Sequence, residues 1–569
     1  MLFGGGLSIC NVYLGLKIGW GMNMSITAAL LGFGFWAAAG RAARIRPFTV
    51  LENNLNQTAA SAGAAISSAG LVAPIPALTY LTGTILTWPQ LTGWVLSVGL
   101  VGVVAGMGVR KQLLIDAGLS FPSGTATGET LKEMYAQGAE AVARVQMLLV
   151  GAVLGAASKL VGLLLHPPHL KLPITLASGK VSTGYTLANL TLSLEPSLLM
   201  VATGGIIGLR ATLSMILGSL LAWGLLVPHG LEAGWIAPGP ADPARNWFTT
   251  SVHWLLWPGA TLMVVGSLTS FAFSAPAIHR GITGVRGAAP PADDPSDVSR
   301  GQFWTSLLVV VVASSLAQVL LFDIKPWLAV LGVLLSFVLA IVAGRVTGET
   351  NVTPVGAMGK VTQLTFGVLD PSNVASNLMS ANVTGGAASQ CGDLLHDLKT
   401  GLMLGSWPRH QYVAQAFGVV GGALIGSAAY LVLLPDPKTQ LFTDDWAAPA
   451  VATWKAVAEV FQQGISAMPP MALEAMAIAA AAGVLLAVAE KTAPKAVRPW
   501  VPSPASLGLA FTVQAYTVFA FFIGAAVMAA GSKFAPRWTS RFGIVICAGV
   551  IAGESLIGVS DAFWKMFGG

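Results

Sequence analysis

Apolar stretches long enough to cross a membrane recur from one end of this sequence to the other. A helix of about 20 apolar residues spans the hydrocarbon core of a bilayer. Runs of this character are 91–107, 145–165, 198–226, 307–321, 327–342, 472–489 and 511–530. The sequence therefore predicts an all-α polytopic membrane protein with roughly 12 to 16 helices, some of them broken or re-entrant where glycine is frequent.

Charged residues are scarce and local. They make up 9% of the chain against 54% hydrophobic residues, whereas a soluble domain carries about 25% charged residues. The net charge of +6 comes from basic clusters at Arg41, Arg44 and Arg46; Arg110 and Lys111; 279–300; Lys491, Lys495 and Arg498; and Lys533, Arg537 and Arg541. By the positive-inside rule these clusters indicate cytoplasmic loops and not a nucleic-acid surface. We expect a multi-pass protein of the cytoplasmic (inner) membrane.

The apolar start of the chain lacks a basic n-region and a cleavage site, so we expect a first membrane segment there and not a removable signal peptide. One stretch, 281–300, is rich in Pro, Gly, Asp and Ser and is expected to be a flexible cytoplasmic linker. It would divide the chain into two halves, 1–280 and 301–569.

The two halves resemble each other in two places. NLNQTAASAGAAISS from Asn54 aligns with NLMSANVTGGAASQC from Asn377, and FPSGTA from Phe121 aligns with VPSPAS from Val501. Secondary transporters are commonly built from two repeats around a site near the middle of the membrane. The alignment predicts such a duplication, and it leaves open whether the halves are parallel or inverted.

The segment LSFPSGTATGETLKEMY, 119–135, is unusually polar for this chain. Pro122 favours a first helical turn, and Ser120 or Ser123 can cap the amides that follow. We therefore expect a helix that begins here and runs to Tyr135. A helix that starts within the membrane offers amide donors and a positive dipole end, which suit a substrate carboxylate.

The side chains of the same segment have two readings. Ser123, Thr125 and Thr127 are candidate substrate-binding residues, but hydroxyls of this kind also serve close helix packing. Glu129 is a candidate proton carrier, because a carboxylate at membrane depth is costly and persists mainly along a pathway. The alternative is an ion pair at a helix end with neighbouring charges.

A second polar segment runs from 347 to 386 and contains the helix breakers Pro354 and Pro371. Unwound backbone is tolerated in a membrane only where it is buried in protein or lines water. This segment is therefore expected to form a wall of a cavity. Its candidate site residues are Glu349, Asn351, Thr353, Gln363, Asn377 and Asn382.

The first 63 residues offer further polar groups within candidate spans. Lys17 is a cation that should face an aqueous cavity or pair with an acid. The other candidates are Asn11, Tyr13, Glu52, Asn54 and Gln57.

Signals for metal binding or catalysis are weak. Residues 391–411 contain two aspartates and two histidines, but a closed ligand set does not converge, and a helix end followed by a basic loop is favoured. Cys10, Cys391 and Cys547 form no CxxC pair. P-loop, HExxH and GxSxG motifs do not occur. We predict no metal site, no cofactor and no enzyme; an intramembrane hydrolase using Ser123 as nucleophile is the disfavoured alternative.

The segments NVYLGLKIGW, SFPSGTATGE, GETNVTPVGAMGKVTQ and DLLHDLKTGLMLGSWPRHQYVAQ resemble signature segments of the oligopeptide transporter family, which includes the yellow stripe-like metal-chelate transporters. The resemblance covers most of the chain from Asn11 to about Gln415. It implies about 16 helices in two related halves and proton-coupled import of small peptides or metal chelates. Little precedes Asn11, so we expect no long hydrophilic N-terminal extension.

The predicted function is a symporter in which 119–135, 347–386 and 50–63 enclose a central cavity. Glu129, Glu349 and Glu52 are the predicted proton carriers, and Lys17 or helix N-termini would hold substrate carboxylates. Import of metal complexes of peptide-like chelators is the alternative. Helix-mediated homodimers are permitted by GxxxG motifs at 102–106, 151–155 and 418–422.

Overall fold

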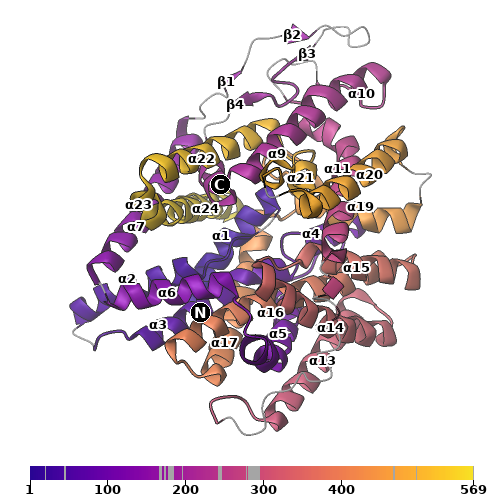
Figure 1. The fold of residues 1–569 in the computed structure, drawn as a ribbon. Coiled ribbons are helices and arrows are strands. Elements are labelled where there is room, and N and C mark those ends of the chain that lie inside the picture. Colours follow the sequence, from indigo (N-terminus) through magenta and orange to yellow (C-terminus); the bar gives the residue numbers. More distant parts are fainter. Residues whose placement is uncertain are drawn as a thin grey trace.

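The computed structural model describes residues 1–569 except 20, 44–45, 137, 166–169, 172–174, 177–184, 195–196, 241–245, 274, 277–278, 280–294, 465–467, 495 and 568–569. The described chain is almost entirely helical, with a few very short strands at one end of the molecule (Figure 1). Most of the predicted linker 281–300 lies outside the described residues. The prediction of an all-α polytopic fold is confirmed.

The first part of the chain folds into helices and four two-residue strands. In order these elements are α1 (Leu2–Ile18), α2 (Ser25–Ala43), α3 (Val50–Ala65), η1 (Ile66–Ala69), α4 (Pro74–Thr82), α5 (Trp88–Arg110), η2 (Lys111–Asp116), α6 (Pro122–Ala136), α7 (Gly138–Leu165), β1 (Leu170–Lys171), β2 (Thr175–Leu176), β3 (Tyr185–Thr186), β4 (Ser193–Leu194), α8 (Leu198–Ile207), α9 (Leu209–Ser219), η3 (Leu220–Leu226), α10 (Val227–Ala233) and α11 (Phe248–Ala272). Strand β1 pairs with β4, and β2 pairs with β3, both antiparallel.

The remainder of the described chain is helical. Its elements are α13 (Arg300–Phe322), α14 (Pro326–Thr350), α15 (Val355–Leu369), α16 (Val374–Leu404), α17 (Pro408–Leu433), α18 (Pro437–Gln440), α19 (Pro449–Gln463), α20 (Ala472–Thr492), η6 (Arg498–Trp500), α21 (Pro504–Leu509), α22 (Ala515–Phe534), α23 (Pro536–Trp538), η7 (Thr539–Gly543) and α24 (Ile544–Phe567).

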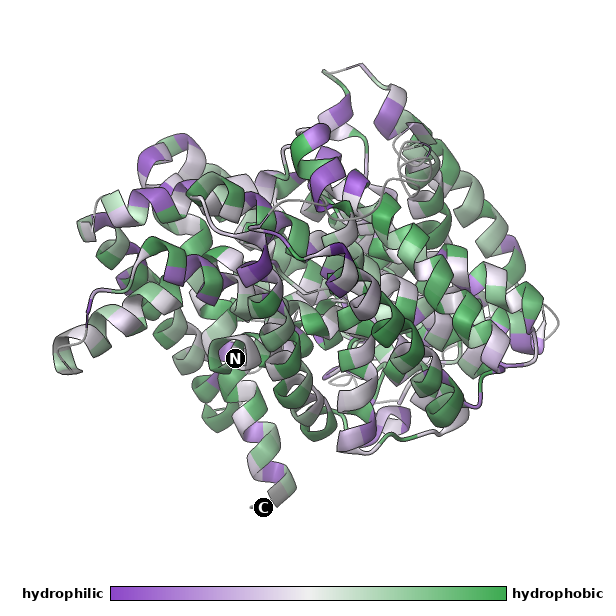
Figure 2. Ribbon diagram, turned by 90° about the horizontal axis from the view of Figure 1, so that it is seen from below, coloured by the Kyte–Doolittle hydropathy of each residue, from purple (hydrophilic) through white to green (hydrophobic). Residues whose placement is uncertain are grey.

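Ten helical stretches among the described residues are long and apolar enough to cross a membrane, and α1, α2 and α8 provide shorter apolar helices. Hydrophobic residues dominate the ribbons on the outside of the molecule (Figure 2). Helices α3, α15 and α16 are not among the helices that are long and apolar enough to cross a membrane, yet most residues of α16 are buried. Helix α16 is therefore enclosed by other helices, whereas α15 keeps an exposed face at Leu364, Val368 and Leu369.

Helices from both sides of the 281–300 segment interleave. The long helix α16 packs against α3, α5 and α6 as well as against its sequence neighbours α14, α15 and α17. At the other end of the molecule, α24 packs along α7, and α22 packs along α8 (Figure 1). The division into two repeat halves stays a prediction from the sequence alignment.

The three GxxxG motifs bring helices of the same chain together. A Cβ added at any of them would overlap a backbone or side-chain atom of a neighbouring helix, so only glycine allows these approaches. The contacts join Gly102 to Ala387 and Gly106 to Leu394; Gly151 to Ile546 and Gly155 to Val550; and Gly418 to Ala59 and Gly422 to Gly63. The expectation that these motifs mediate a dimer is corrected accordingly, and a homodimer stays a prediction without them.

Candidate functional site

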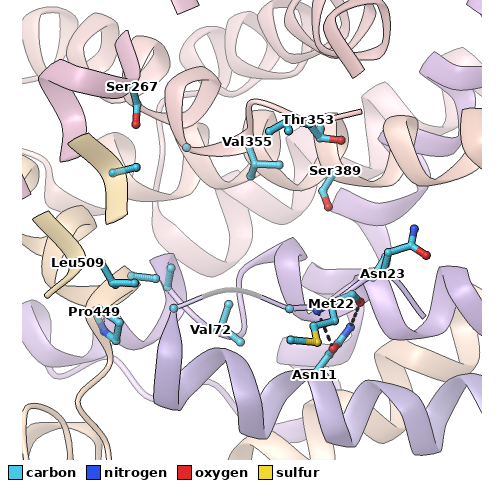
Figure 3. A pocket seen from close by; sticks show the side chains of 18 of the residues that line it. Asn11, Met22, Asn23, Val72, Ser267, Thr353, Val355, Ser389, Pro449 and Leu509 are labelled. Carbon is cyan, nitrogen blue, oxygen red and sulfur yellow. Dashed lines mark hydrogen bonds between the residues drawn. The ribbon is translucent and has the colours of Figure 1, made fainter. Parts of the chain in front are cut away.

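A cavity of about 900 Å³ opens among the polar helices. Its walls come from α1, α3, α6, α8, α11, α15, α16, α19 and α21 and from the connections that follow α1, η1 and α14. Thr353, Val355 and Ser389 lie across the open space from Asn11 and Val72 (Figure 3). The cavity therefore gathers residues that are more than 300 positions apart in the sequence.

One wall is a break between two helices. Helix α14 ends at Thr350, Asn351 takes a left-handed conformation with φ of 64°, and α15 begins only at Val355. The Thr353 hydroxyl lies 3.0 Å from that of Thr347. Both Asn351 and Thr353 line the cavity, so the unwound backbone borders open space, as a membrane interior requires.

The Asn351 side chain caps the start of α6. Its Oδ1 accepts hydrogen bonds of 2.9 Å from both the backbone N–H and the hydroxyl of Ser123. The next amide, of Gly124, donates to His396 Nδ1 at 3.3 Å. The helix begins where the sequence predicts, but its cap comes from α14 and not from Ser120 or Ser123. The first amide donors of α6 are already bonded within the protein, which corrects the expectation that they face a substrate.

The Asn11 side chain holds the opposite wall. Its Nδ2 donates to the carbonyls of Met22 at 2.9 Å and Ala64 at 3.1 Å, and its Oδ1 accepts from the Met22 amide at 3.0 Å. These three bonds fasten the connection after α1 onto α1 and α3 (Figure 3). Asn11 lines the cavity and shapes it through the backbone that it supports.

A buried ammonium group borders the cavity on α15. Lys360 is 4% exposed, and its Nζ donates to Gln363 Oε1 at 2.6 Å and to the Thr453 carbonyl at 3.3 Å. The same nitrogen lies 4.2 Å from the centre of the Trp454 ring, a cation–π distance. In the part of the chain that the structure describes, no carboxylate forms an ion pair with Lys360.

A carboxylate borders the cavity on α16. Asp393 is 9% exposed; its Oδ1 accepts from the Ser61 hydroxyl at 2.8 Å, and its Oδ2 accepts from Gln415 Nε2 at 3.4 Å. One turn further along α16, Asp397 is fully buried and accepts a short hydrogen bond from Gln57 Nε2. The cavity thus has a basic and an acidic side chain in its walls.

The residues Lys360, Asp393 and Asp397 were missed by sequence reasoning. The segment 391–411 was expected to be a helix end followed by a basic loop. Helix α16 does end within it, at Leu404, but both aspartates lie inside the helix, and Arg409 and His410 belong to the start of α17. Residues four apart share a helix face. The spacing of Asp393 with Asp397, matched by Gln57 with Ser61 on α3, is the signal that could have found them.

Four of the predicted substrate-binding residues line the cavity: Asn11, Ser123, Asn351 and Thr353. The remaining nine do not line it. Of these, Gln363 Nε2 bonds to Asn377 Oδ1 at 2.9 Å, and Asn382 Oδ1 accepts from Trp94 Nε1 at 2.8 Å. Both bonds are buried and hold α15 and α5 against α16.

Other predicted substrate-binding residues contact groups of the protein itself or are buried in the described structure. The hydroxyls of Thr125 and Thr127 bond to backbone carbonyls of their own segment, at Ser120 and Ser123. Lys17 Nζ lies 5.7 Å from the Tyr13 ring and 5.5 Å from the Trp446 ring. Asn54 and Gln57 are fully buried on α3.

None of the three predicted proton carriers is among the residues that line the cavity. Glu52 belongs to the capping box of α3, where hydrogen bonds from Thr49 and the pairing with Arg46 hold the pKa of its carboxyl below the ordinary value. Glu129 is exposed on α6, and Glu349 pairs with Arg345 at 3.1 Å.

Comparison with known proteins places this geometry in context. The family model described as "OPT oligopeptide transporter protein" matches residues 1–565. A protein of Saccharomyces cerevisiae named as a candidate oligopeptide transporter is 24% identical over 689 residues, covering 96% of this chain and 92% of that protein.

Two further relatives come from a plant and a bacterium. A metal-nicotianamine transporter of Oryza sativa subsp. japonica is 23% identical over 501 residues, covering 82% of this chain and 72% of that protein. A protein of Haemophilus influenzae, also named as a candidate oligopeptide transporter, is 24% identical over 613 residues, covering 97% of this chain and 92% of that protein.

Proposed function

Because the chain belongs to the OPT oligopeptide transporter family, we propose that it is a secondary transporter that imports small oligopeptides together with protons across the cytoplasmic membrane. A membrane transporter needs a water-accessible site within its apolar helices, and polar groups at membrane depth usually border such a pathway. The cavity among α1, α3, α6, α15 and α16 is our candidate for that site.

The observation that carries this proposal is the pair of opposite charges in the cavity walls. A peptide is a zwitterion with a terminal ammonium group and a terminal carboxylate. Asp393 offers an acceptor to the first, and Lys360, which has no carboxylate partner among the described residues, offers a donor to the second. A volume of about 900 Å³ falls within the range of roughly 300 to 1,000 Å³ for small-molecule sites.

The apolar part of the same lining suits peptide side chains. Met22, Met24, Met263, Trp454 and Leu509 contribute apolar surface around the polar groups. Flexible methionine side chains adapt to ligands of different shape. This composition supports recognition of the two termini of the peptide, with little discrimination among its side chains.

A second substrate class has support from one of the comparisons. The rice relative is named as a metal-nicotianamine transporter, so metal complexes of peptide-like chelators are the alternative cargo. Such a ligand carries its metal already coordinated, and Lys360 would again be the donor to its carboxylate oxygens. We rank peptides first because Asp393 provides the matching acceptor for an ammonium group.

The test is uptake into proteoliposomes. The purified protein should accumulate a labelled dipeptide when an inward proton gradient is imposed, and a protonophore should abolish the accumulation. Competition by unlabelled dipeptide and by iron or zinc nicotianamine separates the two cargo classes. Accumulation that is equal with and without the gradient would refute proton coupling, and uptake of neither ligand class would refute the transport proposal.

A further inference from the structure

A buried layer of polar side chains lies next to the cavity, between α3, α16 and α17. These three helices pack against one another. The layer contains the two α16 aspartates with Gln57 and Ser61 from α3 and Gln415 from α17; all are 9% exposed or less. Carboxylates are rarely buried so deeply unless they are paired or functional.

The donors available to the two aspartates do not satisfy all their oxygens. Asp393 accepts from Ser61 on one oxygen and from Gln415 on the other. Asp397 accepts from Gln57 on Oδ1, while its Oδ2 has no hydrogen-bond partner in the described structure. The Ser25 hydroxyl, which is 3.0 Å from Ser61 Oγ, also faces Asp397.

The side-chain amides of the two neighbouring glutamines, Gln57 and Gln415, contribute oxygen atoms that accept no hydrogen bond in the described structure. Gln57 and Gln415 each direct the nitrogen of the side-chain amide to an aspartate, and the Oε1 atom of each is left without a partner in the described structure. Both residues are 0% exposed. A buried group that lacks its hydrogen bond costs about 1–3 kcal/mol. The layer therefore lacks donors, and one added proton on Asp397 would supply one.

Other ionisable groups near α16 do not provide the missing positive charge. His396 on α16 and Lys360 on α15 share the cavity with Asp393, but their polar contacts are to Gly124, Gln363 and Thr453. The charged groups on the other helices that pack on α16 are paired with one another, bonded to backbone or exposed. These are Arg345 with Glu349, Lys455 with Glu459, Arg110 with Asp297, Glu52 with Arg46, Lys399 with the Leu119 carbonyl, and the exposed Glu129, Lys132, Glu133, Arg300, Arg409 and His410.

We propose that Asp397 carries the coupling proton and that Asp393 is the group through which this proton arrives from the cavity. The inference rests on the proposed function and assigns its coupling site. Two carboxylates one helical turn apart in a buried site repel each other when both are ionised, so the pair favours holding one proton. The proton resides on the deeper aspartate, whose Oδ2 is free, and this leaves Asp393 ionised for a substrate ammonium group.

The proton transfer and the charges balance. A proton from cavity water bonds to an oxygen of Asp393; that O–H bond then breaks as an O–H bond forms at Asp397 Oδ2. The peptide ammonium next pairs with Asp393, and the peptide carboxylate pairs with Lys360. With proton and peptide both bound, every buried charge has an opposite partner or is neutralised. With the proton alone bound, Lys360 and Asp393 carry buried charges that have no opposite partner; with the peptide alone bound, the charge of Asp397 is not neutralised. Each of these states is costly.

The experiment compares Asp397→Asn with wild type in proteoliposomes by two measurements. Exchange of labelled for unlabelled dipeptide without a gradient tests binding and movement, and accumulation under a proton gradient tests coupling. One proton per peptide allows about tenfold accumulation for each pH unit of gradient. The D397N protein should retain exchange, because asparagine resembles the protonated aspartic acid, and should not accumulate the peptide. Glu474→Gln, at an exposed acid on α20, is the matched control and should behave as wild type in both.

The outcomes separate this inference from the proposed function. Wild-type protein without proton-driven accumulation would defeat the proposed function. Wild-type and D397N proteins that accumulate the peptide equally under a proton gradient would overturn only the assignment of Asp397. Accumulation driven by a sodium gradient in place of a proton gradient would overturn both the assignment and the proton coupling of the proposed function. If D397N loses exchange as well, the variant Asp397→Glu is the deciding test, because it keeps a titratable group. It should accumulate peptide with a pH dependence displaced from that of wild type. An unchanged pH dependence would overturn the assignment.

Discussion

The start of α6 and the middle of α16 are two polar regions that touch each other and differ in what their polar groups do. At the start of α6, each of the first donors already has an acceptor: Ser123 bonds to Asn351 and Gly124 to His396. In the middle of α16, Asp397 keeps a lone oxygen in full burial. Our proposal gives the two regions different roles: the satisfied donors at the start of α6 hold the fold, and the unsatisfied oxygen of Asp397 accepts a proton.

The largest effect is expected where the two regions meet. A Cβ at Gly124 would overlap the His396 carbonyl of α16, and backbone cannot yield as a side chain can. Gly124→Val should therefore destabilise the protein by about 3 kcal/mol or more, the upper part of the range for overpacking. Thermal unfolding in detergent measures this loss. Gly138→Ala, where no atom lies within 4 Å of the added Cβ, is the control; equal melting temperatures would show that α6 and α16 are not in close contact.

The next largest effect is expected at Lys360 and tests whether this residue binds the carboxylate of the peptide. Lys360→Met removes the ammonium group and keeps much of the side-chain volume beside Trp454. Hydrogen bonds to charged groups contribute about 1.5–3 kcal/mol, so affinity for a dipeptide should fall by about tenfold or more. Binding of the same dipeptide with an amidated C-terminus should change much less. Equal losses for both ligands, measured by substrate-induced thermal shift, would show that Lys360 does not contact the carboxylate.

A smaller effect tests the structural role of the α6 cap. Asn351→Ala removes the acceptor shared by the Ser123 amide and hydroxyl and should lower the free energy of unfolding by about 1 kcal/mol. Asn351→Asp keeps an acceptor oxygen and should restore most of it. If the alanine variant kept its melting temperature and lost peptide binding, Asn351 would be a binding residue and would not have the structural role that we assign to the start of α6.

The smallest effect concerns Glu129. This side chain is exposed on α6, and surface substitutions usually change stability by less than about 0.5 kcal/mol. Glu129→Gln should therefore leave proton-driven accumulation within about twofold of wild type, in contrast to Asp397→Asn. A loss of accumulation with preserved exchange in this variant would transfer the coupling role from α16 to α6.

The sequence was sufficient for the helical membrane fold and for several cavity segments. Apolar runs of membrane length indicate spans wherever they occur, and helix breakers such as Pro354 mark the unwound wall near Asn351 and Thr353. These signals are local, since they depend on residues that are neighbours in the chain. The start of α6 at Pro122 was predictable for the same reason.

The site chemistry was less predictable because it depends on contacts between distant segments. Ser123 has hydroxyl neighbours that suggest a self-cap, yet its acceptor lies 228 positions away at Asn351. Asp393 and Asp397 look like charges at a helix end until α3 and α17 cover them. The GxxxG motif at 418–422 gives no sign of whether its partner is α3 or a second chain. In each case the role of the residue depends on which other helix covers it, and the local sequence does not contain this information.

The single oxygen of Asn351 that receives both donors of Ser123 has a mechanical consequence. Asn351 ends α14 while it caps α6, and the Gly348 carbonyl beside it accepts from Ser120 Oγ and from the Phe121 amide. The two helix ends are therefore joined by four hydrogen bonds at one place, so a separation of α14 from α6 would have to break all of them.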